Sequence, residues 1–288
     1  MAVDSFRRAL DEGTSSPIVA RLFFGLLQLR DTSKMAVQTP LDSAHFSHTF
    51  DARHRPIFEA CLATRDAARE VLRLSYTHQQ DVATGRVIAF DPPGYQVLST
   101  IDKELSQAIA KLLDQAVIAC KSTLQRMLDE VLQLDIGFLY MKDPAFEEGL
   151  ASLQRDGVTD LQAYLVAVRA TWLSALLSLR NKHEHEGWTL PRCDYAMPTP
   201  GHVTLRLPHI DAAPVDQWAQ KTANQVLRFV EDMIVFGLAR RAPHPLYIVE
   251  VPPQHRDPRN VLRFRLAAKG FHNNTQWTIA YAEEDAFI

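Results

Sequence analysis

The 288-residue sequence predicts a mostly α protein, a helical bundle with a small β appendage at the C-terminus. Three observations support this fold class. Hydrophobic residues make up 47% of the chain, which is ample for a core. In several long segments, apolar residues recur every three or four positions, which is the period of an amphipathic helix. Beyond residue 241, apolar and polar residues alternate over short runs, which is typical of strands.

The first fifty residues are predicted to form two short helices followed by a loop. Residues 3–11 resemble a short helix, and Pro17 opens a second helix whose apolar face runs over 18–27. Residues 31–52 lose the helical period and are rich in Thr, Ser, His and Asp, so we expect a loop there. Three histidines lie in or just beyond this stretch, and we expect them to be solvated because no carboxylate or cysteine spacing completes a metal site: His45, His48 and His54.

The middle of the chain is predicted to be helical with clear breaks. Pro56 is expected to open a helix that reaches Tyr76, and the glycines and prolines of 79–94 interrupt the pattern. The longest apolar stripe follows over 101–131 and indicates a core helix or a bundle seam. A short helix near 144–155 leads to the amphipathic run that begins at Thr159.

The last hundred residues change in character. The alternation of Val203, Leu205 and Leu207 with polar residues predicts a strand. A long apolar period over 215–238 predicts another helix. Three short strands are then expected at 246–249, 261–265 and 277–280.

These patterns suggest two parts, a helical domain over 1–241 and a small β-rich segment over 242–288 that packs on it. The N-terminal residues are mixed and charged, and no run of 18 apolar residues occurs, so we expect no signal peptide and no membrane contact. The three cysteines are far apart and are expected to be reduced, which suits a cytoplasmic protein.

The net charge of −3 excludes a global electrostatic attraction for nucleic acid, so any phosphate binding must come from a local patch. The segment 240–269 is the best candidate for contacts with RNA, with Tyr247 and Phe264 available to stack on bases. A solvated basic β edge that prevents aggregation explains the same charges equally well. The arginines proposed to contact RNA are Arg240, Arg241, Arg256, Arg259, Arg263 and Arg265.

The candidate site is the polar cluster that ends the amphipathic run from Thr159. There the sequence reads R-N-K-H-E-H-E-G-W over 180–188, and Gly187 and Pro191 predict the end of the helix. Two other arginines have a histidine at comparable spacing, in the pairs Arg73–His78 and Arg265–His272. Only Arg180 is followed by a polar residue, Asn181, and only Arg180 ends a long amphipathic helix.

The order of Arg180, Asn181 and His185 resembles the motif of the HEPN superfamily, in which an arginine precedes a histidine by a few residues and a polar residue follows the arginine. The resemblance covers the helical part of the chain. It implies a metal-independent endoribonuclease of a bacterial toxin or antiphage-defence system, without a cofactor, and with RNA and an antitoxin or other defence protein as the expected partners. Regulation through a tyrosine two residues after the histidine, found in some members, is in doubt because Gly187 stands there.

The residue types suit cleavage of RNA by its own 2′-hydroxyl. A histidine can exchange a proton near neutral pH, and an arginine offers a fixed fork of donors to phosphate oxygens. We therefore assign Arg180 to the phosphorane, His185 to acid–base chemistry and Asn181 to orienting them, with His183, Glu184 and Glu186 in support. Residues five apart on a helix diverge by about 140°, so we expect two copies of the motif to meet at a homodimer interface.

Other interpretations of the cluster remain open. Arg180–Glu184 and Asn181–His185 are spaced four apart, which also suits ordinary pairs on a helix surface. A non-catalytic scaffold of the same family could use these residues to bind a nucleotide or a protein. His183 and His185 could hold a metal if they were on a strand, but on a helix they face different ways and no third ligand is obvious. We expect no metal.

Overall fold

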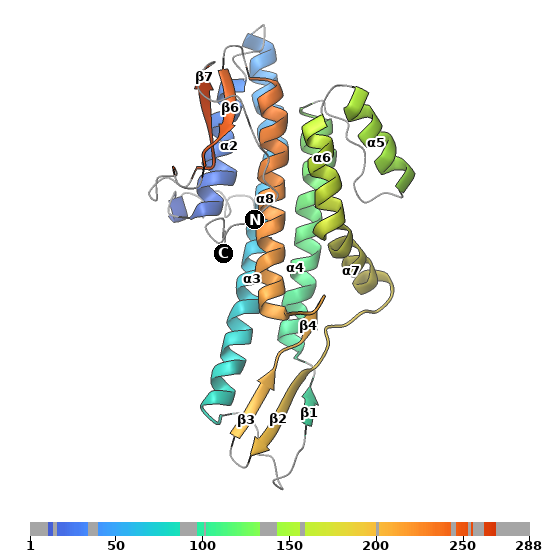
Figure 1. The fold of residues 1–288 in the computed structure, drawn as a ribbon. Helices are drawn as coiled ribbons and strands as arrows, with labels where there is room; N and C mark the ends of the chain where they lie inside the picture. Colours follow the sequence, from blue (N-terminus) through green and yellow to red (C-terminus); the bar gives the residue numbers. More distant parts are fainter. Residues whose placement is uncertain are drawn as a thin grey trace. The chain divides into compact units, whose positions relative to one another are not determined.

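The computed structural model is mostly α-helical with a few short strands, which confirms the predicted fold class (Figure 1). The structure describes residues 11–13, 16–33, 40–86, 97–100, 102–132, 143–155, 159–199, 202–242, 246–252, 255 and 262–268.

The helices alternate between α and π geometry in three places. The α-helices are α2 (Leu26–Ser33), α3 (Pro40–Ala83), α4 (Lys103–Ser122), α5 (Asp143–Arg155), α6 (Thr159–Val168), α7 (Ser174–His185) and α8 (Val215–Arg240). The π-helical segments are η2 (Val19–Gly25), η4 (Thr123–Asp129) and η5 (Arg169–Leu173). The predicted helices at 144–155 and 215–238 are therefore confirmed, and the predicted helix at 3–11 lies outside the described residues.

The predicted loop at 31–52 is wrong for most of its length, because α3 begins at Pro40 and continues through Pro56 to Ala83. The apolar period of α3 includes His54, which is buried. Its ring stacks on Phe50 and Phe58, and its Nε2 lies 2.7 Å from the carbonyl oxygen of Leu22 in η2. The sequence concealed the start of this helix because residues 40–52 are rich in Ser, His and Asp, although Phe46 and Phe50 are buried there. His45 and His48 are exposed, as predicted.

The strands form three small antiparallel sheets. One has the order β1–β2–β3, with β1 (Val97–Thr100), β2 (Cys193–Thr199) and β3 (His202–Arg206). The others pair β4 (His209–Ile210) with β5 (Ala213–Pro214) and β6 (Leu246–Glu250) with β7 (Phe264–Ala268). The sequence predicted β3, β6 and an approximate β7 but missed β1 and β2. The strand expected at 277–280 lies outside the described residues.

The chain forms two compact units, each made of segments distant in sequence. Unit 1 consists of Met1–Leu62, Ala116–Leu177 and Asn224–Phe287, and unit 2 consists of Ala63–Gln115, Ser178–Ala223 and Ile288. Unit 1 thus includes helices as well as the β6–β7 hairpin, and the predicted domain boundary at 241 stays a prediction. The three cysteines are free and buried.

Among the described residues, the helix Leu161–His185 is long and apolar enough to cross a membrane by length and composition. Its most apolar window has a mean hydropathy of 1.2 and is 39% buried. Buried core helices of soluble proteins pass the same test. The expectation that the chain makes no membrane contact therefore stays a prediction.

Candidate functional site

The polar cluster lies at the C-terminal end of α7, within unit 2, and its backbone explains where the helix stops. Gly187 adopts φ = +70°, a backbone conformation that residues other than glycine rarely adopt. The backbone N–H groups of Glu186 and Trp188 both donate to the carbonyl of Lys182, at 3.0 Å. The sequence signal for a helix end at Gly187 is therefore confirmed, and α7 remains helical through both Arg180 and His185.

Arg180 is held by two carboxylates. Its Nη1 pairs with Glu184, one turn further along α7, and its Nε lies 3.8 Å from Oδ1 of Asp114 in α4. The Arg180 side chain is 28% exposed, so its guanidinium is restrained but still reaches solvent. Sequence reasoning found Glu184 from its spacing but missed Asp114, which comes from a different helix.

His185 and Arg180 approach each other through Glu184. The Oε2 atom of Glu184 that pairs with Arg180 also lies 3.2 Å from Nε2 of His185. The His185 side chain is 66% exposed. The two residues point in different directions from a straight helix, but both side chains turn toward the same carboxylate, so their functional groups come closer within one chain than the helix geometry alone predicts.

The remaining residues of the cluster have separate roles or none that the structure resolves. Nδ1 of His183 lies 3.1 Å from the carbonyl oxygen of Trp188, so the ring supports the turn that ends α7. The two rings meet edge to face, 6.2 Å apart. Asn181 and Glu186 are exposed, and across the described part of the chain Asn181 makes no hydrogen bond that would orient Arg180 or His185. Among the residues that the structure describes, no group of three His, Cys, Asp or Glu side chains is arranged to hold a metal ion.

The other arginine–histidine pairs differ in their surroundings. Arg73 is exposed on α3 and donates to Glu70 at 2.6 and 2.8 Å. His78 lies 3.3 Å from Asp102 rather than near Arg73. Arg73 and His78 therefore share no carboxylate, unlike Arg180 and His185. His272, of the third pair, lies outside the described residues.

The described arginines among those predicted to contact RNA differ in their exposure. Arg240 and Arg265 are exposed, whereas Arg241 is partly buried with its guanidinium 5.1 Å from the ring centre of Phe46. Arg263 is fully buried, so its assignment to RNA contact is wrong. Phe264 is buried as well and cannot stack on a base, whereas Tyr247 is exposed. Arg256 and Arg259 lie outside the described residues.

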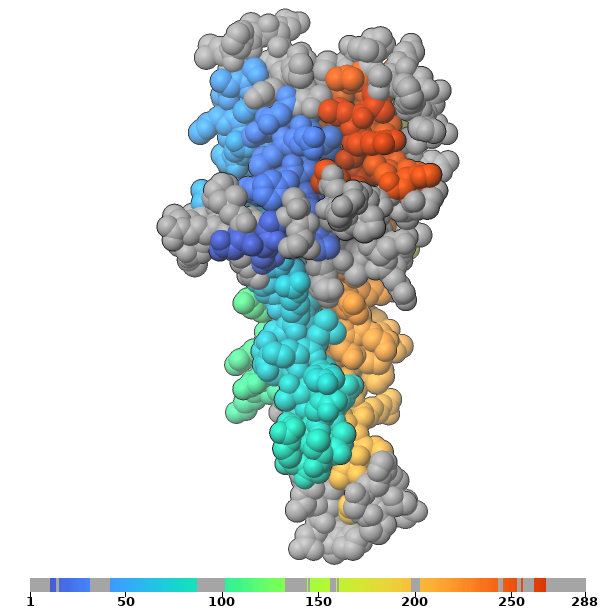
Figure 2. All heavy atoms as spheres, turned by 90° about the vertical axis from the view of Figure 1, so that its left-hand side faces the viewer, coloured from blue at the N-terminus to red at the C-terminus, as the bar shows by residue number. Residues whose placement is uncertain are grey.

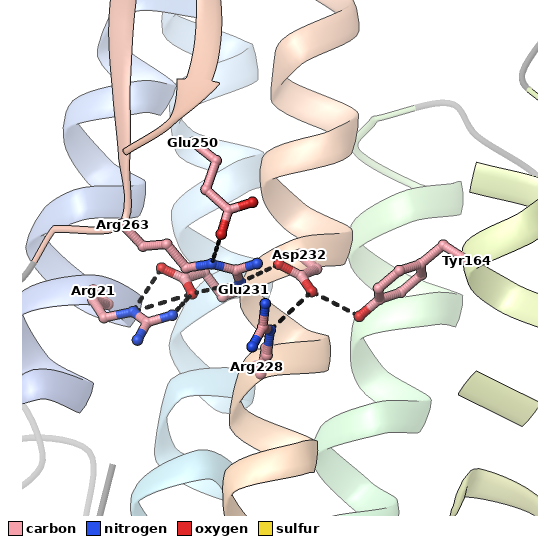
Figure 3. Close-up of polar contacts among 7 residues, drawn as sticks. All are labelled: Arg21, Tyr164, Arg228, Glu231, Asp232, Glu250 and Arg263. Atoms are coloured by element: carbon pink, nitrogen blue, oxygen red, sulfur yellow. Dashed lines mark hydrogen bonds and ion pairs between the residues drawn. The ribbon is translucent and has the colours of Figure 1, made fainter. Parts of the chain in front are cut away.

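Arg263 instead belongs to a buried charge network in unit 1 (Figure 3). Its Nη1 pairs with Asp232 and lies 3.4 Å from Glu231, and its Nε donates to Glu250 at 2.8 Å. Glu231 also accepts from Arg21, at 3.1 Å from Nε to each carboxylate oxygen. Asp232 accepts from the hydroxyl of Tyr164 at 2.7 Å, and Arg228 Nε lies 3.8 Å from its Oδ2. The network therefore comprises three arginines and three carboxylates, with one tyrosine; we call it the buried charge network.

Burial and neighbouring charges shift the pKa values of the network's two α8 carboxylates, Glu231 and Asp232, in opposite directions. Burial raises the pKa of Asp232 to about 6, against the opposing effect of Arg263 and Arg228. Burial also acts to raise the pKa of Glu231, but the charge and hydrogen bonds of Arg21, together with Arg263, hold it below its usual range. The same carboxylates raise the pKa of Arg263 despite its burial. Glu231 is therefore firmly ionised, whereas Asp232 can bind a proton at mildly acidic pH.

No family model, no curated protein and no solved structure matches this chain.

Proposed function

We propose that this chain is a metal-independent endoribonuclease of the bacterial toxin or antiphage-defence type. The observation that carries the proposal is the convergence of Arg180 and His185 on the Glu184 carboxylate at an exposed helix end. This arrangement gives an anion-binding fork and a titratable group a common location. The resemblance of R-N-K-H-E-H to the HEPN motif supports the same reading.

In the proposed reaction, His185 removes the proton from a ribose 2′-hydroxyl, and the oxygen attacks the adjacent phosphorus. Arg180 donates to the phosphorane oxygens, where charge accumulates. Protonation of the departing 5′-oxygen then leaves a 2′,3′-cyclic phosphate and a free 5′-hydroxyl. A single histidine cannot readily serve at both oxygens, so we propose that a second copy of the chain supplies the second histidine in a homodimer.

The two carboxylates on Arg180 set a condition for this reaction. Asp114 and Glu184 together carry two negative charges beside one guanidinium, so a phosphate must compete with them for Arg180. Both carboxylates are about half exposed, which makes the pairs weak and exchangeable. A dimer partner, an RNA backbone or a released antitoxin would shift this competition. We place the active protein in the cytoplasm, where RNA is available.

The test is RNA cleavage by the purified full-length chain in EDTA. We expect Arg180→Ala and His185→Ala to lower cleavage at least 100-fold, because each removes an interaction that forms in the transition state. Arg73→Ala and His78→Ala are matched controls with the same residue types and spacing, and they should retain full activity. Cleaved ends should carry 2′,3′-cyclic phosphate. Equal activity in all five proteins, or activity that requires a divalent metal, would overturn the proposal.

The second candidate is a non-catalytic scaffold in which the same cluster binds a nucleotide or a protein. The pairing of Arg180 with two carboxylates favours it, because an arginine that is already neutralised holds a helix end together without any substrate. Tight binding of a nucleotide or partner without turnover, lost in Arg180→Ala, would identify this function.

A further inference from the structure

The β6–β7 hairpin contacts η2 and α8 of unit 1 through Leu262 and Arg263, the two residues that precede β7. In Figures 1 and 2 the hairpin lies beside α2. Leu262 packs against Gly25 so closely that a Cβ added to the glycine would lie 2.9 Å from the leucine Cδ2. Arg263 follows immediately and enters the buried charge network. Its own carbonyl accepts from Val251 N–H at 2.7 Å, which fixes it to the strand register of the hairpin.

Arg263 joins carboxylates from two different elements. Glu231 and Asp232 belong to α8, and Glu250 belongs to β6 of the hairpin. No other arginine of the network comes from the hairpin, since Arg21 lies in η2 and Arg228 lies in α8. Arg263 therefore links the hairpin directly to two carboxylates of α8.

The energetics of this attachment are unusual. An intact buried ion pair contributes little net stability, whereas removal of one partner leaves a buried charge that strongly destabilises its surroundings. Without Arg263, Asp232 would lose its closest cationic partner and Glu250 would lose its pair with the Arg263 guanidinium. The least costly relief is for water to reach these carboxylates, and a two-stranded hairpin, which is marginal by itself, can move away more readily than a packed helix.

We propose that Arg263 is a charge latch that fastens the β6–β7 hairpin to α8, and that the chain has an open state in which this hairpin is detached while the helices remain folded. In the closed state the network pairs three guanidinium groups with three carboxylates, and all of these except Glu250 are buried. In the open state the carboxylates of α8 and the apolar hairpin residues Ile248, Val249 and Phe264 become available to another surface. The latch is independent of the proposed nuclease site, which lies in unit 2.

Hydrogen exchange of the full-length chain, followed by peptide mass spectrometry, tests the latch. In Arg263→Met we expect amides of 246–250 and 264–268 to exchange at least tenfold faster than in the wild type. Amides of α8 away from the network, and those of α4, should keep their protection. Arg263→Lys, which retains a positive charge, should show a smaller acceleration of exchange in the same peptides only. If Arg263→Met does not fold, Arg263→Lys takes its place in the test.

Two further variants separate a latch from general core damage. Arg265 lies in β7, two residues after Arg263, and its side chain is exposed. Arg265→Met should therefore leave the amide exchange of the hairpin unchanged. Arg21→Met removes another partner of Glu231 from a different element, and it should accelerate exchange in η2 rather than selectively in the hairpin. Equal loss of protection in helices and hairpin for Arg263→Met, or no change in the hairpin, would overturn the proposal.

Discussion

Two clusters in this chain use the same chemistry in opposite environments. At the end of α7, Arg180 and His185 share the exposed Glu184 carboxylate, whereas in unit 1 three arginines and two carboxylates are buried and the third carboxylate, Glu250, is 12% exposed. Exposed ion pairs contribute about 0–1 kcal/mol and exchange partners freely. Buried pairs are costly to break, because the surviving charge has no solvent. Burial, rather than residue type, therefore decides which cluster is open to solvent and which one is held in the core.

The largest expected effect comes from removing one carboxylate from each cluster. Glu231→Gln leaves Arg21 and Arg263 without their shared carboxylate, and we expect it to lower the free energy of unfolding by about 3–5 kcal/mol. Glu184→Gln, the matched change at the exposed end of α7, should alter it by less than about 1 kcal/mol. Urea denaturation of both variants measures this. Similar losses in the two proteins would remove the distinction between the clusters.

A smaller effect concerns the pH dependence of stability, to which two buried groups of unit 1, Asp232 and His54, contribute with opposite signs. Burial raises the pKa of Asp232 from 3.8 to about 6, so its contribution to stability is present at low pH and is lost as pH rises through 6. Burial lowers the pKa of His54 from 6.5 to about 4, so its contribution is present above 6.5 and is lost as pH falls toward 4. In the wild type these two dependences should largely cancel between pH 4.5 and 6.5.

Single variants should expose the two slopes separately. In Asp232→Asn, the free energy of unfolding should rise from pH 5 to 6.5 by about 1–2 kcal/mol more than in the wild type, since the opposing contribution of Asp232 is gone. In His54→Gln it should fall by a similar amount over the same interval, since the opposing contribution of His54 is gone. Urea midpoints at pH 5, 5.75 and 6.5 give the slopes. Parallel profiles in all three proteins would show that neither group has the stated pKa.

The smallest expected effect lies in the exposed cluster and involves only the backbone. Gly187→Ala places a Cβ in open space, so the cost of φ = +70° is purely conformational, about 1 kcal/mol. Thermal denaturation should show a correspondingly small decrease in Tm. If the end of α7 positions Arg180 and His185, RNA cleavage should fall with it. A neutral result in both measurements would show that the turn after α7 tolerates other conformations.

The sequence by itself predicted the helical class, the long helix α8, the end of α7 at Gly187 and the hairpin strand β6. These features depend on local periodicity and on backbone preferences that each residue carries with it. The same local reasoning failed over the start of α3, where Ser, His and Asp residues obscure an apolar face that tertiary packing buries. It also failed for β1 and β2, whose pairing joins residues almost a hundred positions apart, Val97 with Ala196.

Only the tertiary structure decided which charged residues meet. Arg263 stands between ordinary strand residues and has the sequence context of a surface arginine, so nothing local distinguishes it from the exposed Arg265. Its partners Glu231 and Asp232 lie about thirty residues earlier in a helix, and Asp114 likewise reaches Arg180 from another helix. Burial and long-range pairing are properties of the packed chain. The sequence therefore determined the elements and a candidate motif, whereas packing determined that one charge cluster is buried in unit 1 and the other is exposed.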